Sequence, residues 1–144
     1  MLYTPKTKVA LRICFEAHAN QLDKSGIPYV FHPFHVAEQM QTEDEVCVAL
    51  LHDVVEDTDL TLYDLRAAGM NDEVLAAIAL LSHDPAVPYL EYVASVGENA
   101  LARRVKVEDL RHNCDLARLD APTERDYERV KKYHKALEVL GEHV

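Results

Sequence analysis

The sequence predicts an all-α fold, with about seven to eight helices in a single domain that covers residues 1–144. Two observations support this prediction. Signals for helix starts recur along the whole chain, and no stretch alternates between apolar and polar residues at the period of two that half-buried strands show. A length of 144 residues is also typical of one domain and is sufficient to bury an ordinary hydrophobic core.

Capping residues, prolines and glycines divide the chain into its helical segments. Pro5 after Thr4 favours a first helix that extends to about Leu22. Thr42, with Glu45 three residues later, forms a capping box before an almost wholly apolar segment, which predicts a central, buried helix. The helices that begin at Pro33, Thr61, Tyr89, Asn99 and Thr123 are expected to end near Gln41, Gly69, Val96, Leu119 and Gly141, and a further helix is expected to begin at Asn71.

The charge of the chain is strongly negative and unevenly distributed. The net charge of −10 argues against nucleic acid as a partner, because a phosphate backbone requires a basic surface. Residues 38–73 contain eleven acidic residues and only Arg66 as a base, whereas residues 1–30 and 103–118 are each mildly basic. This pattern suits a cation site that also receives an anionic ligand, although most of these acids are expected to be solvated helix faces.

Cysteine usage and hydropathy favour a cytoplasmic protein. Cys14, Cys47 and Cys114 are scattered and lack C-x-x-C spacing, so we expect free thiols, two of them buried. No apolar run approaches the roughly 20 residues that span a bilayer, and the N-terminus has no signal-peptide pattern, so no membrane partner is expected. The sequence does not indicate an oligomeric state.

The segment HDVVEDT, residues 52–58, is the strongest local feature. It follows the most apolar helix and combines one imidazole with three carboxylates. If the helix continues through it, His52 and Glu56, and Asp53 and Asp57, are neighbours on its surface. Buried charges must be paired or bind a metal, and few basic residues lie nearby in the sequence. A divalent cation would neutralise this cluster.

Two further segments offer metal ligands. His32 precedes Pro33 at an expected helix start, where its side chain is free to point out of the helix. In VKVEDLRHN, the residues Lys106, Asp109 and Asn113 are three and four apart and share one helix face. Mixed imidazole and carboxylate ligands suit Mn²⁺, Fe²⁺ or Zn²⁺ better than Ca²⁺. The complete candidate site consists of His32, His52, Asp53 and Asp109.

These residues predict metal-assisted hydrolysis of a phosphate ester or anhydride. Such a site would lower the pKa of a water molecule and hold a substrate phosphate. Glu56 and Asp57 lie one turn beyond the ligands and are candidates for positioning the water, accepting its proton or protonating the leaving oxygen. Lys24 and Lys106 are candidates for neutralising the phosphates.

Three motifs resemble the HD phosphohydrolase superfamily, and in particular the hydrolase domain of the RelA/SpoT family and its small stand-alone alarmone hydrolases. They are AHANQLDKSGIPYVFHP, ALLHDVVEDT and VKVEDLRHN, and the similarity extends over nearly the whole chain. The resemblance implies an HD-type helical bundle that removes the 3′-pyrophosphate from guanosine tetra- or pentaphosphate. A synthetase domain is not expected in a chain of this length.

The resemblance also implies roles for individual residues. The metal, usually Mn²⁺ in this family, would be bound by His32, His52, Asp53 and Asp109. Glu56 and Asp57 would form the catalytic pair, and Lys24 and Asn113 would contact the nucleotide.

Two positions depart from the family pattern. Asp23 stands where the family usually has an arginine that contacts the purine, and Ser82-His83 replaces a Thr-Lys pair. Asp23 removes a cation and a flat stacking group from the expected base pocket. His83 is a candidate substrate contact in place of the lysine. The base that is recognised is therefore left open by the sequence.

Each of these residues also has a purely structural interpretation. His52 and Asp53 could pair with each other without a metal. Glu56 and Asp57 could be solvated acids, although acids at a helix C-terminus are unfavourable. The same structural interpretation applies to His32, Lys24 and His83.

Three functional hypotheses follow. The first is an alarmone pyrophosphohydrolase. The second is a related nucleotide phosphatase or phosphodiesterase with a different base specificity, which Asp23 and Ser82-His83 favour. The third is a non-catalytic protein that senses a nucleotide or neutralises a toxin. The presence of all the expected catalytic residues argues against this third hypothesis.

Overall fold

A computed structural model describes residues 1–143, which form nine α-helices and one short 3-10 helix without a β-strand. The all-α prediction is therefore confirmed for this range. The helices are α1 (Pro5–Ala17), α2 (Phe31–Glu38), α3 (Glu43–Leu51), α4 (Val54–Asp57), α5 (Leu62–Ala67), α6 (Asp72–Leu81), α7 (Tyr89–Gly97), α8 (Ala100–Asn113), η1 (Leu116–Arg118) and α9 (Glu124–Val139).

The predicted helix starts are confirmed at the capping residues. The side chains of Thr4, Thr42, Thr61 and Thr123 each accept a hydrogen bond from the backbone N–H three residues later, and all four form capping boxes. The first-turn N–H groups have no partner inside a helix, so such side chains fix where a helix begins. Asn71 and Asn99 cap α6 and α8, and Pro88 precedes α7.

Two predicted helix ends are wrong, because the backbone groups beyond each helix form hydrogen bonds within a loop instead of continuing the helix. The first helix ends at Ala17 rather than Leu22, since the 18–29 loop folds back on itself in an isolated antiparallel bridge between Leu22 and Pro28. The helix from Asn99 ends at residue 113 rather than 119. There Asp115 leaves the helix and its side chain caps the short η1 helix.

The second helix begins two residues earlier than predicted, at Phe31 rather than Pro33. The backbone N–H groups of Phe31 and His32 donate to the carbonyls of Pro28 and Tyr29, which starts the helical turn before the proline. Pro33 is tolerated within the first turn because its missing N–H would have had no helical partner there.

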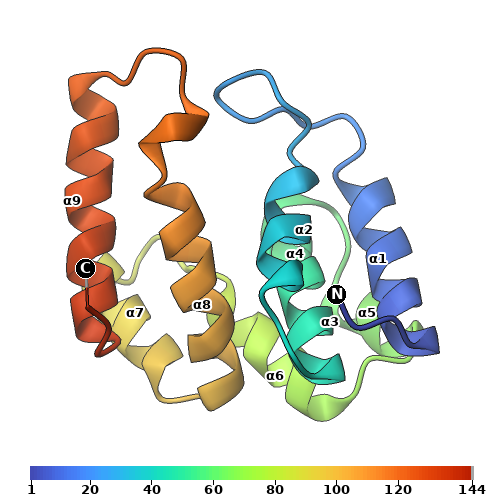
Figure 1. Ribbon diagram of the computed structural model, residues 1–144. Helices are drawn as coiled ribbons and strands as arrows, with labels where there is room; N and C mark the ends of the chain where they lie inside the picture. The colour runs from blue at the N-terminus through green and yellow to red at the C-terminus, as the bar shows by residue number, and fades with distance from the viewer. Residues whose placement is uncertain (144) are drawn as a thin grey trace.

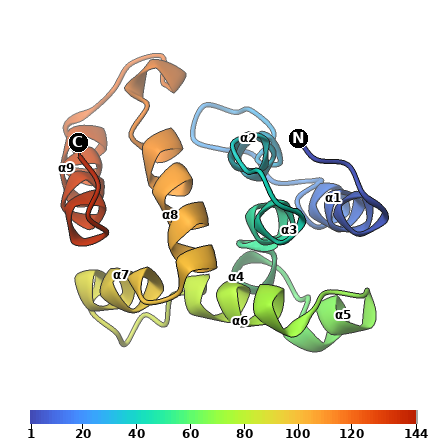
Figure 2. The same ribbon diagram turned by 60° about the horizontal axis from the view of Figure 1, so that its bottom comes forward.

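Helix α3 is the centre of the fold, as its apolar sequence predicts. The six residues of 46–51 are fully buried, and α3 packs against α1, α2, α6 and α8. Helix α8 in turn packs against α9 and α7. Figure 1 shows α7, α8 and α9 on one side of the molecule and α1, α2 and α3 on the other, and Figure 2 shows α8 between α9 and the α2–α3 pair. Side chains at the α2–α3–α8 contact are therefore brought together from distant segments.

The described helices and cysteines bear on two further sequence expectations. No helix within residues 1–143 has both the length and the apolar character that crossing a membrane requires. Cys14, Cys47 and Cys114 are free thiols, and the first two are buried as predicted.

We expect the Thr42→Ala substitution to lower the free energy of unfolding by about 1 kcal/mol, because it removes the capping box of the central helix. The Thr42 hydroxyl accepts from the Glu45 N–H at 3.2 Å, and the Glu45 carboxylate accepts from the Thr42 N–H at 3.1 Å. Urea titration measures the change. Gln41→Ala, at an exposed neighbouring position, is the control, and equal stability of the two variants would contradict the prediction.

Candidate active site

A break between two helices positions the His52-Asp53 pair. Helix α3 ends at Leu51, His52 and Asp53 form a turn, and α4 begins at Val54. The continuous helix considered from the sequence is therefore absent, and the spacing argument built on it does not hold across the turn. The turn instead places His52 at the buried end of α3, where the protein interior surrounds its ring.

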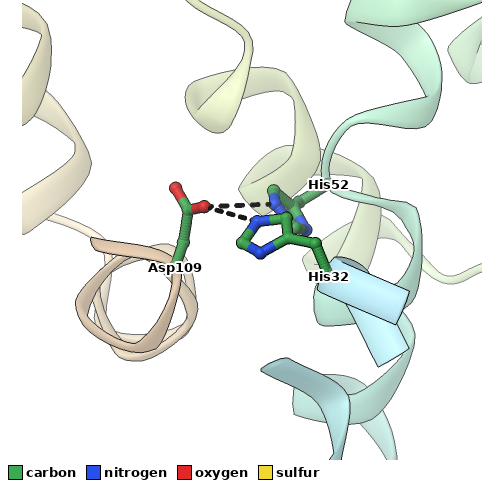
Figure 3. Close-up of side chains that lie close together, drawn as sticks. All are labelled: His32, His52 and Asp109. Carbon is green, nitrogen blue, oxygen red and sulfur yellow. Dashed lines mark hydrogen bonds and ion pairs between the residues drawn. The ribbon is translucent and has the colours of Figure 1, made fainter. Parts of the chain in front are cut away.

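Two histidines and one aspartate meet at the junction of α2, α3 and α8. His32 lies in the first turn of α2, His52 directly follows α3, and Asp109 lies in α8. Asp109 Oδ1 is 2.8 Å from His32 Nε2 and 3.8 Å from His52 Nε2. One potential ligand atom of each residue lies within 4.8 Å of the others, and all three residues are buried. Figure 3 shows the two imidazole rings and the carboxylate directed toward one another.

The hydrogen bonds of the two histidines leave their Nε2 atoms suited to a cation. His52 Nδ1 lies 2.6 Å from the Ala49 carbonyl and donates its proton there, so the ring, when it is neutral, has its lone pair at Nε2. That buried Nε2 has no hydrogen-bond partner. His32 Nδ1 lies 2.7 Å from His112 Nδ1, and its Nε2 is in hydrogen-bond contact with Asp109 Oδ1 at 2.8 Å. A His32 ring that donates from Nδ1 to His112 would present the lone pair of Nε2 to a metal ion held between the ring and Asp109. Two such imidazoles beside a carboxylate fit a divalent metal ion.

Asp53 lies beside this group but is held by another partner. Its Oδ2 is 3.1 Å from His52 Nε2 and accepts a hydrogen bond from the hydroxyl of Tyr29. The three-residue cluster of potential ligands does not include it. The structure thus brings three of the four expected ligands into one cluster, with the fourth in contact with one of them.

Charge pairing offsets the burial of the acidic groups. Burial opposes ionisation of Asp109, but the Lys106 ammonium, 2.9 Å from Oδ2, and the two histidines hold its pKa well below the usual range. Burial also opposes ionisation of Asp53, but His52 lowers its pKa to about 2. Burial lowers the pKa of the His52 imidazole, but the carboxylates of Asp53 and Asp109 have the larger effect, and the pKa is raised. The carboxylates are therefore ionised at neutral pH.

The two expected catalytic acids are the last two residues of the short helix α4. Glu56 lines a cavity of about 210 Å³ together with His52, Asp53 and Asp109, and its carboxylate accepts the His83 backbone N–H at 3.1 Å. Burial raises the pKa of the Glu56 carboxyl. A raised pKa suits a group that exchanges a proton near neutral pH.

Asp57 is at the end of α4 and does not line that cavity. Burial is the main cause that raises its pKa, and the nearby Asp53 adds to it, while His18 and His52 lower it. The structure thus separates the expected pair, with Glu56 facing the cavity and Asp57 outside it.

The expected substrate contacts are divided between two adjoining cavities. Lys106 and His83 line the cavity of about 210 Å³, whereas Lys24 lines a second cavity of about 340 Å³. Asn113 and Tyr133 line both. The cavities therefore adjoin at these two residues, an arrangement that can accommodate the two ends of one elongated ligand.

Three of these side chains also have partners within the protein. Lys106 is paired with Asp109, and Asn113 donates to Asp109 Oδ1 at 3.1 Å. The His83 ring donates to the Val87 carbonyl at 2.7 Å. These three side chains therefore also stabilise the site through contacts within the protein.

Asp23 has a structural role in the loop that borders the second cavity. Its Oδ1 accepts the backbone N–H groups of Ser25 and Ile27, at 2.8 and 3.0 Å, and its Oδ2 lies 3.6 Å from a guanidinium nitrogen of Arg118. Arg118 also lines the cavity. A guanidinium is therefore present at this cavity, although it comes from η1 rather than from position 23.

Tyr29 and His112 are site residues that the sequence-based set did not include. Tyr29 bonds Asp53, and His112 bonds His32. Both lie three positions from an expected ligand, Tyr29 before His32 and His112 after Asp109, so helical spacing was the signal available. Burial, together with the neighbouring His32, lowers the pKa of His112 to about 3, so its ring is neutral and can accept a hydrogen bond.

Known proteins of similar sequence carry related names. Guanosine-3′,5′-bis(diphosphate) 3′-pyrophosphohydrolase MESH1 of Danio rerio is 33% identical over 132 residues, which cover 82% of this chain and 72% of that protein. A Mycobacterium leprae protein named "Probable GTP pyrophosphokinase" is 30% identical over 145 residues, covering 92% of this chain. No model of a protein family matches the chain.

The fold is also similar to a solved structure of another protein. That protein is a metazoan ortholog of SpoT that hydrolyses ppGpp and plays a role in starvation responses. The TM-score is 0.79 at 25% sequence identity, and the match covers 97% of this chain and 88% of the other. The chain spans only 12% and 18% of the length of two longer relatives, so the similarity to those concerns one part of each.

Proposed function

This chain belongs to the RelA/SpoT-like family of HD-type alarmone hydrolases, and we propose that it removes the 3′-pyrophosphate from guanosine 3′,5′-bis(diphosphate), ppGpp, with a divalent metal ion. The observation that carries this proposal is the convergence of His32, His52 and Asp109 at a buried junction of three helices. A buried cluster of imidazoles and a carboxylate is typical of a metal centre.

The metal would be bound by these three residues, with Asp53 as the fourth ligand beside His52. Mn²⁺ is the ion that we propose, because the donor set is mixed imidazole and carboxylate and the family resemblance implies manganese. When bound, the ion supplies positive charge to a phosphate oxygen and lowers the pKa of a water molecule.

Glu56 is the proposed proton acceptor for the attacking water, and the charge of Asp57, outside the cavity, helps to raise the pKa of Glu56. The water oxygen forms a bond to phosphorus, and the bond between that phosphorus and the 3′ oxygen breaks. One proton of the water passes to Glu56, which then gives a proton to the leaving 3′ oxygen, so that this oxygen becomes the 3′ hydroxyl of guanosine 5′-diphosphate. The second product is pyrophosphate.

The two adjoining cavities suggest how the substrate lies. The pyrophosphate group would occupy the cavity with the candidate metal ligands, near Lys106 and His83. The nucleoside and its 5′-diphosphate would occupy the larger cavity, near Lys24, with Asn113 between the two. Lys106 would act mainly by holding Asp109, to which it is already paired.

A related nucleotide is the second candidate substrate, and Asp23 is the observation that favours it. Its carboxylate is bound to loop N–H groups and to Arg118, so it offers no stacking surface to a purine. A protein with this pocket could select a different base while the hydrolytic reaction stays the same.

We also propose that the protein works in a reducing compartment, the cytoplasm. Cys14 and Cys47 are buried free thiols, and burial raises the pKa of each to about 12. Thiols of this kind stay protonated and unreactive.

A nucleotide panel tests the proposed reaction. Purified protein with Mn²⁺ should convert ppGpp to guanosine 5′-diphosphate and pyrophosphate, measured by anion-exchange chromatography. Turnover of another nucleotide in its place would favour the second candidate, and no turnover of any nucleotide would contradict hydrolysis as the function. A chelator-treated sample, with Mn²⁺ restored afterwards, is the control for metal dependence.

We expect the His112→Phe substitution to weaken Mn²⁺ binding by about 10–100-fold, because it removes the acceptor that orients His32. Phenylalanine keeps a flat ring next to His35, whose ring stacks on His112 at 4.0 Å. His35→Phe is the matched control and should leave the affinity nearly unchanged. Isothermal titration with Mn²⁺ measures both, and equal affinities in the two variants would contradict the orienting role.

A further inference from the structure

An unpartnered hydroxyl lies at the active-site cavity. Within residues 1–143, three buried side-chain atoms lack a hydrogen-bond partner: His18 Nε2, His52 Nε2 and the Tyr89 hydroxyl oxygen. His52 is already assigned to the metal centre. Tyr89 begins α7 and lines the same cavity of about 210 Å³ as the candidate metal ligands. A buried hydroxyl without a partner is unfavourable unless a ligand or water satisfies it, so Tyr89 marks a place where a polar group binds.

A lysine of α9 lies over the ring that carries this hydroxyl. The Lys132 ammonium is 4.1 Å from the centre of the Tyr89 ring, and Lys132 lines the cavity as well. The neighbouring Lys131 is an exposed residue that pairs with Glu128 one turn away. Lys132 is also exposed, but it has no ion-pair partner among the described residues, and its ammonium lies over the Tyr89 ring at the cavity.

The charges of the cavity make Lys132 the cation that is available to an incoming anion. The cavity is lined by carboxylates, and the buried Lys106 is paired with Asp109 at 2.9 Å. The His83 side chain donates to a backbone carbonyl. Among the described residues that line this cavity, Lys132 is therefore the lysine without a carboxylate partner that an incoming anion would meet.

We propose that Tyr89 and Lys132 form a subsite for the outer phosphate of the pyrophosphate group. The assignment to pyrophosphate rests on the proposed function. Both residues line the cavity of the metal centre and neither lines the larger cavity, which adjoins it at Asn113 and Tyr133. A ligand that spans both cavities places its nucleoside away from Lys132 and its pyrophosphate next to it. The ammonium and the hydroxyl then donate to oxygens of the same phosphate.

The test compares two neighbouring lysines of one helix. Lys132→Ala removes the proposed contact, whereas Lys131→Ala removes an exposed lysine that pairs with Glu128. With ppGpp and Mn²⁺, we expect Lys132→Ala to raise KM by about tenfold with little change in kcat, as loss of a charge-assisted contact to bound substrate does. Lys131→Ala should match the wild type. Equal KM values for the two variants would overturn the subsite.

A binding measurement separates the subsite from the proposed function. Inorganic pyrophosphate is titrated into the Mn²⁺-loaded protein and its variants by calorimetry, which needs no turnover. About tenfold weaker binding to Lys132→Ala and several-fold weaker binding to Tyr89→Phe, with Lys131→Ala unchanged, would support the subsite even if ppGpp is not the substrate. Unchanged pyrophosphate affinity in all three variants, or no pyrophosphate binding by the wild type, would overturn it. Thermal unfolding of each variant checks that the fold is retained.

Discussion

Replacing His52 by alanine should lower the turnover of ppGpp by at least about a thousandfold, because the metal centre loses a ligand and the charge stabilisation it provides is worth several kcal/mol. His52 is the strongest candidate for this test. Its ring is 3% exposed, its Nδ1 is fixed on the Ala49 carbonyl, and its buried Nε2 has no hydrogen-bond partner. Elemental analysis of the purified variant, together with product formation at saturating substrate, measures the effect.

The same experiment separates a metal ligand from a structural histidine. A purely structural ring would leave metal content unchanged after His52→Ala, and retained turnover with full metal content would contradict the proposed role. His143→Ala, at an exposed position near the end of the described chain, is the control for non-specific metal binding by histidines. It should keep both the metal and the activity of the wild type.

Replacing Glu56 by glutamine should lower kcat by about 10²–10⁴-fold while Mn²⁺ affinity stays the same, because the amide cannot accept the proton of the attacking water. The amide oxygen can still accept the hydrogen bond from the His83 N–H, so the local fold is retained. Single-turnover kinetics measures the chemical step. Asp59→Asn, which removes an exposed acid of the following loop, is the control.

The pH dependence provides an independent test of Glu56. Its pKa is raised by burial, and a base must be ionised, so wild-type kcat should fall as the pH decreases through that raised pKa. The loss should therefore begin at a higher pH than for an ordinary glutamate. The residual activity of Glu56→Gln should lack this acidic limb. An unchanged acidic limb in the variant would assign the titration to another group.

The helix starts and the composition of the site were accessible from sequence because both depend on local chemistry. A capping box is complete within four residues, so Thr42 and Glu45 identify the start of α3 without any tertiary information. The candidate ligands were found because His32, His52 and Asp109 are residue types that are costly to bury without a partner. The structure brings these three together.

The ends of helices and the partners of charged side chains were not accessible, since both depend on contacts between distant segments. The first helix was extended past Ala17 because the bridge between Leu22 and Pro28 has no signature in the helical pattern. The turn at His52-Asp53 was missed for the same reason. The position of Lys132 was not accessible either, because only the packing of α7 against α9 places its ammonium over the Tyr89 ring.

The junction of α2, α3 and α8 has a consequence for folding as well as for chemistry. His32 and Asp109 are 77 residues apart in the sequence, so an ion held between them closes a long loop and connects the two sides of the molecule in Figure 1. Binding to the native state alone adds stability by mass action, about 2.7 kcal/mol at a free ion concentration one hundred times Kd. If the ion is manganese, as proposed, the melting temperature of the protein should rise with the free manganese concentration. Depletion of that ion would then lower the amount of folded protein as well as the proposed activity.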